Sequence, residues 1–301
     1  MNARERLALQ TSETASNPEP AAIERVIVVG AGTMGSGIAQ VIAQAGIPTT
    51  LTDADMASLE RGYEGVASRW QRLVETGRRT QDDVASFRAN LSLGTVAEAA
   101  NANLVIEAIV EKPAAKSALF EELAMVSPTQ TIFASNTSSI SISTLGRASG
   151  RPDRFLGLHF FNPVPVLPLV EIVRGLETSE CTLATSVKFV EAIGKTPIVV
   201  GDSPGFVANR ILLPMINEAI FALQDGVAPA AAIDEVMKLG MSHPMGPLAL
   251  ADLIGLDICL DILETMHRDF GDDKYRPAPM LRRMVGAGKL GRKAGQGFFE
   301  Y

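Results

Sequence analysis

Cysteine is scarce in this chain of 301 residues, which contains only Cys181 and Cys259. Two thiols this far apart supply neither a zinc-ligand pattern nor a disulfide framework, so we expect no metal site and a reducing compartment such as the cytoplasm. Long apolar runs are missing too. None approaches the roughly 18 consecutive apolar residues of a membrane helix, and the N-terminus lacks a signal-peptide core. These absences predict a soluble, non-secreted protein without a membrane partner.

Positive charge is also in short supply. The chain has 27 Lys and Arg residues against 34 Asp and Glu, which gives a formal net charge of -7. A protein that binds a nucleic-acid duplex normally presents a positive face to the phosphates, so we do not expect a nucleic-acid partner. The content of 47% hydrophobic and 20% charged residues is that of an ordinary globular protein. Any anionic ligand must therefore meet local positive groups.

The first 22 residues are polar and have no sustained apolar period, so we interpret residues 1–22 as a disordered leader. From Arg25 onward, short β-branched runs alternate with longer amphipathic stretches. This alternation is typical of parallel strands joined by crossover helices. It predicts an α/β domain over residues 23–203 with a doubly wound, mostly parallel sheet of the Rossmann type. We expect its strands at residues 26–29, 49–53, 91–93, 104–108, 131–135, 155–159, 169–173 and 196–200.

After Gly201 the strand signals stop, and a second, all-helical domain is expected over residues 204–301. The segment 202–205 is its predicted hinge. The first expected helix carries an apolar face that exceeds what a small bundle can cover, which favours a homodimer through these helices. Packing of this face onto the first domain is the alternative. The expected helices lie at residues 206–223, 229–239, 247–253, 256–268 and 280–287, and the face comprises Ile211, Met215, Ala219 and Ala222.

A glycine motif follows the first expected strand and leads into a helical pattern. It consists of Gly30, Gly32 and Gly35, with Thr33 and Met34 between the last two. In this context the first glycine permits a tight turn and the second lets the backbone approach a pyrophosphate. The third allows close packing of the helix, whose N-terminus stabilises negative charge. The motif therefore predicts a bound dinucleotide.

The second expected strand ends at Asp53, 23 residues after Gly30. A carboxylate at this place can accept hydrogen bonds from both ribose hydroxyls and would repel a 2'-phosphate, so we expect NAD rather than NADP. The alternative is that Asp53 only caps the next helix and that the glycines only shape a turn.

His159 ends an apolar strand, and Glu171 lies in the next one. Taking a proton from an alcohol while hydride leaves its carbon requires a base that works near neutral pH. A carboxylate partner can fix the imidazole tautomer and stabilise the imidazolium. By residue type these two side chains suit that chemistry. A histidine held in place by a structural hydrogen bond, beside a solvent-facing glutamate, is an equal alternative.

Several motifs occur in a specific order along residues 25–301, and through them the sequence resembles the 3-hydroxyacyl-CoA dehydrogenase family. They begin at Ala134 (ASNTSS), His159 (HFFNP), Asp202 (DSPGF) and Pro244 (PMGP), and the last is GRKAGQGF near the C-terminus. The resemblance implies NAD-dependent, reversible oxidation of L-3-hydroxyacyl-CoA to 3-ketoacyl-CoA. An acyl-CoA substrate is therefore expected.

The resemblance also implies roles for individual residues. The residue matching His159 is the general base, and the one matching Glu171 is its partner. Ser138 and Asn209 match positions that contact the substrate or the catalytic histidine. On the cofactor side, the matching residues are Glu111, Lys116 and Asn162.

The CoA contacts do not transfer, because Arg69 and Thr76 stand where family members often carry Ser and Lys. Five arginines in this predicted helical arm suit the CoA phosphates, although a solvated helix face explains them equally. These arginines are Arg61, Arg69, Arg72, Arg78 and Arg79.

Two rival functions remain: a dehydrogenase of a free hydroxy acid, as in the similar carnitine and gulonate enzymes, and a non-catalytic NAD-binding protein, as in related lens crystallins.

Overall fold

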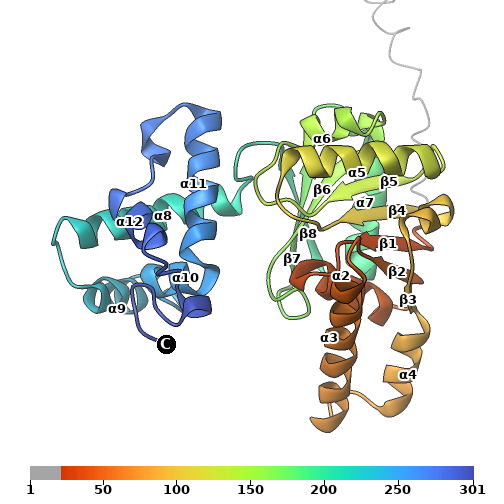
Figure 1. Ribbon diagram of the computed structural model, residues 1–301, viewed down its shortest axis with the longest axis horizontal. Helices are drawn as coiled ribbons and strands as arrows, with labels where there is room; N and C mark the ends of the chain where they lie inside the picture. Colours follow the sequence, from red (N-terminus) through yellow and green to blue (C-terminus); the bar gives the residue numbers. More distant parts are fainter. Residues whose placement is uncertain (1–21) are drawn as a thin grey trace, which may run out of the picture. The chain divides into compact units, whose positions relative to one another are not determined.

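The computed structural model of the protein describes residues 22–301 (Figure 1). The chain divides into two compact units, the first ending at Asp202 and the second comprising Ser203–Tyr301. The leader predicted over residues 1–22 lies, except for its last residue, outside the described residues. No helix within residues 22–301 combines the length and the apolar character needed to cross a bilayer.

The first unit contains an eight-stranded sheet in the order β3-β2-β1-β4-β5-β6-β7-β8. Neighbouring strands are parallel except for the antiparallel pair β6 and β7. The predicted fold class is confirmed, and each predicted strand is found to within one residue at either end. The strands are β1 (Val26–Val29), β2 (Thr49–Thr52), β3 (Leu91–Leu93), β4 (Leu104–Glu107), β5 (Ile132–Ser135), β6 (Phe155–Phe160), β7 (Leu169–Arg174) and β8 (Thr196–Gly201).

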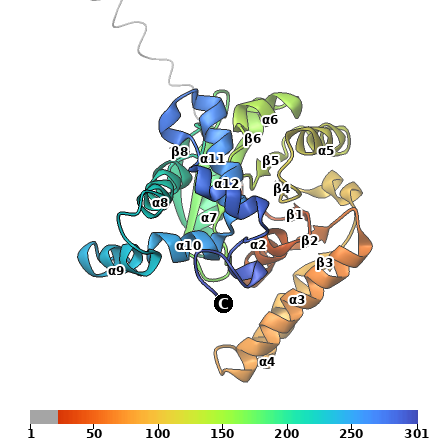
Figure 2. The same ribbon diagram turned by 60° about the vertical axis from the view of Figure 1, so that its left-hand side comes forward.

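Within the described part of the chain, six α-helices accompany this sheet, with helices on both of its faces as in a doubly wound fold (Figure 1). Figure 2 shows that α3 and α4 extend away from the sheet as an arm. The helices are α2 (Thr33–Gln44), α3 (Met56–Glu75), α4 (Gln81–Ala89), α5 (Pro113–Val126), α6 (Ile142–Ala148) and α7 (Glu180–Ala192).

The centre of the sheet is where its strand order reverses. From β1 the chain crosses to β2 and β3 on one side, and from β4 it continues to β5 and β6 on the other. All four residues of β1 are buried, as expected for a strand covered by helices on both faces. Ligands of doubly wound folds bind outside the carboxyl ends of the strands at such a switch point. Here these ends lead into Gly30 and Ala108.

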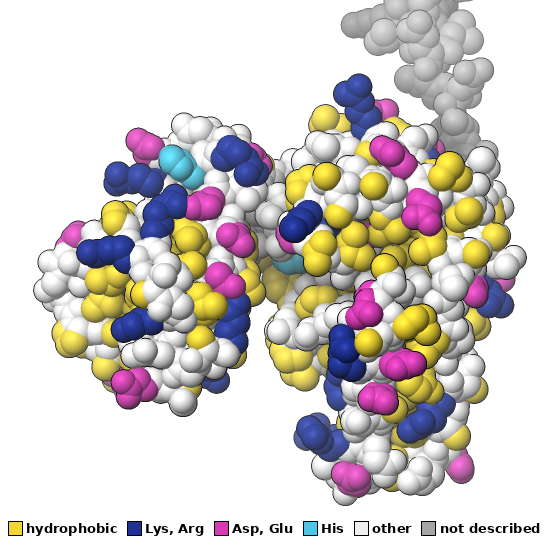
Figure 3. All heavy atoms as spheres, viewed as in Figure 1, with side chains coloured by type: hydrophobic (Ala, Val, Ile, Leu, Met, Phe, Trp, Pro, Cys, Tyr) yellow, Lys and Arg dark blue, Asp and Glu magenta, His cyan; other side chains and the backbone are white. Residues whose placement is uncertain are grey.

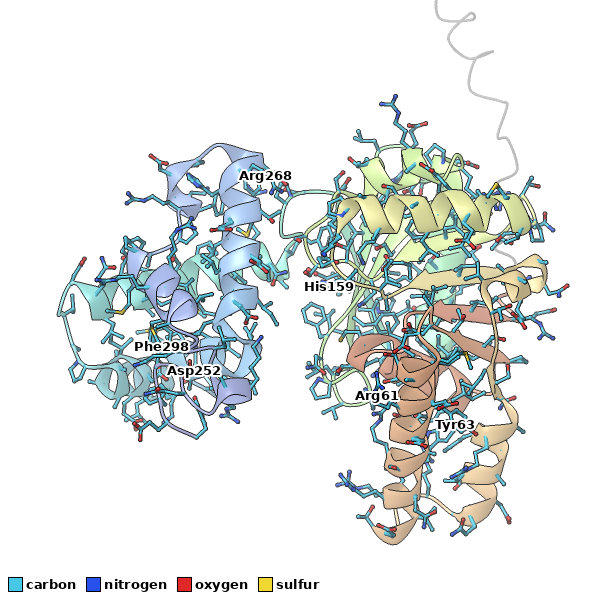
Figure 4. The ribbon with its side chains drawn as sticks, viewed as in Figure 1. Arg61, Tyr63, His159, Asp252, Arg268 and Phe298 are labelled. Atoms are coloured by element: carbon cyan, nitrogen blue, oxygen red, sulfur yellow. The ribbon has the colours of Figure 1, made fainter. Side chains whose placement is uncertain are left out.

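The second unit is helical, and its core is lined by apolar side chains of α8, α10, α11 and α12. The helix predicted over 206–223 begins two residues late, because Gly205 and Phe206 have φ angles of 77° and 51° that do not fit a helix. Asp252, which is buried, accepts hydrogen bonds from the backbone of Phe298 and Phe299 and so holds the C-terminal residues (Figure 4). The helices are α8 (Ala208–Gln224), α9 (Ala230–Gly240), α10 (Pro247–Ile254), α11 (Leu256–Phe270) and α12 (Pro279–Gly286).

Candidate active site

The glycine turn connects β1 to α2. Gly30 has a φ of 104°, and a Cβ on it would lie 2.5 Å from the carbonyl oxygen of Ala108. A Cβ on Gly35 would lie 1.7 Å from the carbonyl oxygen of Gly30, so both positions exclude a side chain for internal reasons. Gly32 differs: apart from its own residue and its neighbours along the chain, no atom of the described residues lies within 4 Å of the place where its Cβ would be. The open space at Gly32 is what an approaching pyrophosphate requires.

The start of α2 suits an anion. Gly32 is the N-cap of this helix, and among the described residues no side chain caps it. The first N–H groups of a helix carry partial positive charge, so the exposed turn at Gly32 and Thr33 is a place where phosphate oxygens are stabilised. Met34 follows in the same turn and is half-buried.

Asp53 lies directly after β2, next to the glycine turn. Its Oδ2 accepts a hydrogen bond of 2.7 Å from the backbone N–H of Ala31, and its Oδ1 accepts one of 3.0 Å from Asp55. The N-cap of α3 is Asp55, which accepts a hydrogen bond from Ser58. The alternative that Asp53 merely caps the next helix is therefore wrong, and its carboxylate is tied to the dinucleotide turn instead.

His159 and Glu171 are cross-strand partners. The antiparallel register of β6 and β7 sets them directly opposite one another. Nδ1 of His159, which is labelled in Figure 4, lies 2.7 Å from Oε2 of Glu171. Both residues are buried. An ionised carboxylate only accepts hydrogen bonds, so the proton of the neutral imidazole is on Nδ1 and the basic lone pair on Nε2. The alternative of a solvent-facing glutamate is ruled out.

Glu111 organises the loop that follows β5. Its Oε1 accepts hydrogen bonds from the hydroxyl of Thr137 and from the backbone N–H of Ser138 at 3.0 Å, and the Ser138 hydroxyl lies 3.4 Å away. Burial of Glu111 opposes ionisation, but the charge of Lys116 and these hydrogen bonds outweigh it and lower its pKa. The carboxylate is thus held ionised where it positions Ser138.

Lys116 is buried in the first turn of α5, with 1% of its surface exposed. Its Nζ lies 2.6 Å from Oε1 of Glu107 and 3.1 Å from Oε2 of Glu111. Taking an ammonium group out of water costs several kcal/mol, and two carboxylates offset this cost here. This burial excludes Lys116 as a solvated surface residue.

Two further predicted residues lie in other segments of the chain. Asn162 lies exposed in the loop between β6 and β7. Asn209 lies buried in the first turn of α8, in the second unit. Their roles toward cofactor and substrate stay predictions.

The arginines of the arm are in different environments. Arg69 is half-buried and donates to the side chains of Gln40 and Ser36, which ties α3 to α2. Arg61 lies on α3 and pairs with Asp55, whereas Arg72, Arg78 and Arg79 are exposed. Figure 3 shows basic, acidic and hydrophobic side chains interspersed over this arm. A solvated helix face fits this mixture at least as well as a phosphate site.

Sequence reasoning missed two polar residues at this edge. Glu107 ends β4 and is fully buried. Asn136 accepts a hydrogen bond of 2.8 Å from the backbone N–H of Phe160 and so joins the loop after β5 to the end of β6. A glutamate at the end of an otherwise apolar strand was the available signal for Glu107. Asn136 lies within the ASNTSS motif, which indicated the family but not a role for this residue.

These groups come from neighbouring strands. The carboxyl ends of β1, β4, β5 and β6 lie along one edge of the sheet, and the antiparallel β7 begins at the same edge. An enzyme that transfers hydride from an alcohol needs a dinucleotide site and a base for the hydroxyl proton, and this edge offers both. The first unit is therefore that of a nicotinamide-dependent dehydrogenase.

Comparison with known proteins narrows this class. Residues 25–203 match the model of the NAD-binding domain of 3-hydroxyacyl-CoA dehydrogenase, and residues 205–301 match that of its C-terminal domain. The chain therefore belongs to the 3-hydroxyacyl-CoA dehydrogenase family, and its cofactor is NAD.

Individual relatives agree over nearly the whole chain. A probable 3-hydroxybutyryl-CoA dehydrogenase of Bacillus subtilis is 51% identical over 280 residues, which cover 93% of this chain and 98% of the relative. A protein of the same description from Deinococcus radiodurans is 50% identical, with 91% and 99% covered. The crystal structure of (S)-3-hydroxybutyryl-CoA dehydrogenase from Ralstonia eutropha has a TM-score of 0.91 at 47% identity, with 93% and 99% covered.

Proposed function

We propose that the protein catalyses the reversible, NAD-dependent oxidation of an L-3-hydroxyacyl-CoA to the 3-ketoacyl-CoA, with His159 as the general base. The observation that carries this proposal is the buried 2.7 Å pair of His159 and Glu171 at the carboxyl edge of the sheet. The relatives named above are described as acting on 3-hydroxybutyryl-CoA. We therefore propose a short acyl chain.

His159 performs the proton transfer. With Nδ1 donating to Glu171, Nε2 is the atom that accepts the proton of the 3-hydroxyl group. Glu171 then faces a positive imidazolium, which its negative charge stabilises. In the reverse direction the imidazolium returns the proton to the oxygen of the reduced ketone. Bound NAD supplies the hydride acceptor.

Ser138 and Asn209 hold the substrate in this scheme. The Ser138 hydroxyl can donate to the C3 oxygen while Glu111 fixes the backbone beside it. The Asn209 amide orients the thioester side. Neither group needs to ionise.

The residues that fit the dinucleotide lie at the switch point. Gly30, Gly32 and Gly35 form the turn, and the start of α2, with Thr33 and Met34, faces the phosphates. The carboxylate of Asp53 accepts hydrogen bonds from the ribose hydroxyls. Nearer the nicotinamide we place Glu111, Lys116 and Asn162.

We further propose that the protein is a cytoplasmic homodimer. Both cysteines are free, as in a reducing compartment. On α9, Val236 and Leu239 are 63% and 76% exposed and lie three residues apart on one helix face. Of the apolar face expected on α8, Ile211 is exposed whereas Ala219 belongs to the core. Exposed apolar helix faces of this kind support association through the second unit.

One assay series tests the activity. Acetoacetyl-CoA reduction by NADH is compared with NAD-linked oxidation of free carnitine and of free gulonate, all followed by nicotinamide absorbance. We expect turnover of acetoacetyl-CoA and no turnover of carnitine or gulonate. Turnover of either free hydroxy acid alone would select the rival dehydrogenase, and NADH binding without any turnover would select the crystallin-like protein.

A further inference from the structure

The carboxylate of Glu107 is the most enclosed charged group in the first unit's site region, and the proposed reaction does not use it. It is fully buried at the end of β4. Its Oε1 accepts hydrogen bonds from Lys116 Nζ at 2.6 Å and from the backbone N–H of Ile109 at 2.7 Å, and its Oε2 accepts one of 2.6 Å from the Ser135 hydroxyl. Groups from β4, the segment after it, α5 and β5 thus meet at one point.

Lys116 is held between two negative groups. Its Nζ is 2.6 Å from Glu107 and 3.1 Å from Glu111. An ammonium between two carboxylates is drawn to both, so its position depends on the charge on each side. Burial raises the pKa of Glu107, whereas Lys116 and the hydrogen bonds oppose that rise. Lys116, whose Nζ is 2.6 Å away, is the main group that favours the ionised form of Glu107.

Glu111 links Lys116 to Ser138. One of its oxygens pairs with Lys116, and the other accepts hydrogen bonds from Thr137 and from the Ser138 backbone. A shift of the ammonium toward Glu111 would reorient that carboxylate. The Ser138 hydroxyl, which is proposed to meet the C3 oxygen, would then move with its loop.

We propose that Glu107 is a positioning residue for substrate reduction, acting through Lys116 and Glu111 on Ser138. This inference rests on the proposed function. The charge of Glu107 balances that of Glu111 across Lys116 and so fixes the loop after β5. A purely structural link between β4 and α5 would not need the buried charges of Glu107 and Lys116, because well-packed apolar side chains hold such elements together equally well.

The test is Glu107→Gln. The amide can still accept hydrogen bonds with its oxygen and face Ser135 with its NH2 group, so the substitution removes little besides the charge. We expect kcat for acetoacetyl-CoA reduction to fall roughly tenfold, a typical coupling between contacting residues. The Kd for NADH, measured by fluorescence titration, should change by no more than a few fold, because the glycine turn that binds the pyrophosphate is not displaced even though Lys116 and Glu111 lie nearer the nicotinamide. Unchanged kcat would overturn the proposal.

Ser135→Ala is the matched control. It removes a hydrogen bond from the other oxygen of Glu107 but leaves Lys116 and both carboxylates in place. We expect its kcat to equal that of the wild type. An equal loss of kcat in the two variants would mean that Glu107 merely joins β4 to β5, and the proposal would be wrong.

A double-mutant cycle with Ser138→Ala adds a readout that a structural role would not move. If Glu107 acts through Ser138, then Glu107→Gln should lower kcat by less than about twofold once Ser138 is already Ala. Multiplicative losses would contradict the proposed route. This comparison holds even if the single substitution also lowers the melting temperature.

A second variant covers the case in which Glu107→Gln does not fold. Glu107→Gln combined with Lys116→Met removes the buried ammonium as well, so no unbalanced charge remains. We again expect kcat to fall roughly tenfold, and to fall by less than about twofold when Ser138 is already Ala. A kcat equal to that of the wild type would overturn the proposal.

These experiments separate the two proposals. If the wild-type chain does not reduce acetoacetyl-CoA, the proposed function fails and the role of Glu107 fails with it. If the wild type and the Glu107→Gln variant are equally active, only the role of Glu107 is refuted.

Discussion

The carboxylate of Glu171 determines the tautomer of the His159 imidazole. The short contact with Glu171 fixes which nitrogen carries the proton, and burial keeps water from competing for that hydrogen bond. The ring of Phe161 lies 4.6 Å away, centroid to centroid, and adds an apolar wall. The same histidine without this carboxylate would populate both tautomers, and only one of them has its lone pair on Nε2.

Replacing His159 by Gln should lower kcat by a factor on the order of 10² to 10⁴, because no group then accepts the proton from the alcohol or returns it to the ketone oxygen. The Kd for NADH should change little. Stopped-flow or steady-state reduction of acetoacetyl-CoA measures the first quantity, and fluorescence titration the second.

A control for this substitution is available in the second unit. His267 pairs with Asp273 at 3.1 Å but is partly exposed on α11. His267→Gln makes the same chemical change and should leave turnover unchanged. Wild-type turnover in the His159 variant would refute the assignment of the base.

Secondary-structure elements bring distant residues together at this edge. The glycine turn is the clearest example, since its three glycines serve different ends. Gly30 and Gly35 are required by the packing of β1, α2 and the residues after β4, whereas Gly32 faces open space. Substitutions at different glycines of this turn should therefore affect the stability of the protein and its affinity for the dinucleotide separately.

Gly32→Ala should weaken NADH binding by about tenfold or more, because the added methyl group occupies the space through which the pyrophosphate approaches the backbone. The φ of −65° suits alanine, and the loss of a glycine N-cap costs less than about 1 kcal/mol, so the melting temperature should barely change.

Gly35→Ala provides the contrast. Its Cβ would overlap the Gly30 carbonyl, so this variant should lose thermal stability as well as NADH affinity. Equal melting temperatures for the two variants would show that the turn is more adaptable than its packing indicates.

The helix α11 determines how one of the two thiols reacts. Cys259 is buried in this helix, and burial raises the pKa of its thiol to about 12. Cys181 is only partly buried. At pH 8 a thiol reagent should therefore modify one cysteine rapidly in the native protein and two after denaturation. Rapid modification of both would mean that α11 opens readily, and Cys181→Ser identifies which thiol reacts first.

The proposed dimer is a property of the whole molecule. A dimer through the helical unit would cover apolar side chains that a single chain exposes on α9. Sedimentation at micromolar protein should give twice the chain mass of 32.0 kDa. The double substitution Val236→Asp and Leu239→Asp should shift this mass to that of one chain.

Met125→Asp is the matched control for the dimer. Met125 is 80% exposed on α5 of the first unit, so a charge there should not affect association. A single-chain mass for the wild type would refute the dimer. A doubled mass that persists in the α9 variant would place the contact elsewhere.

Much of this protein could be predicted from local patterns. Apolar periodicity and turn residues placed the strands and helices, the glycine spacing indicated the dinucleotide, and the order of several motifs indicated the family, all of which were confirmed. These features depend on near neighbours in the chain, and a sequence displays near neighbours directly. The individual site residues stay predictions, although the register of β6 and β7 brings His159 and Glu171 into contact.

The tertiary structure alone decided which charges are buried and what they meet. Periodicity does not reveal that Glu107, Lys116 and Glu111 converge from the end of β4 and the start of α5, or that Ser135 joins them from β5. Nor does it show that Arg69 is tied to α2 rather than exposed with Arg72. Such contacts arise when separate elements pack side by side, and the cost of burying a charge is set by the groups that packing places around it.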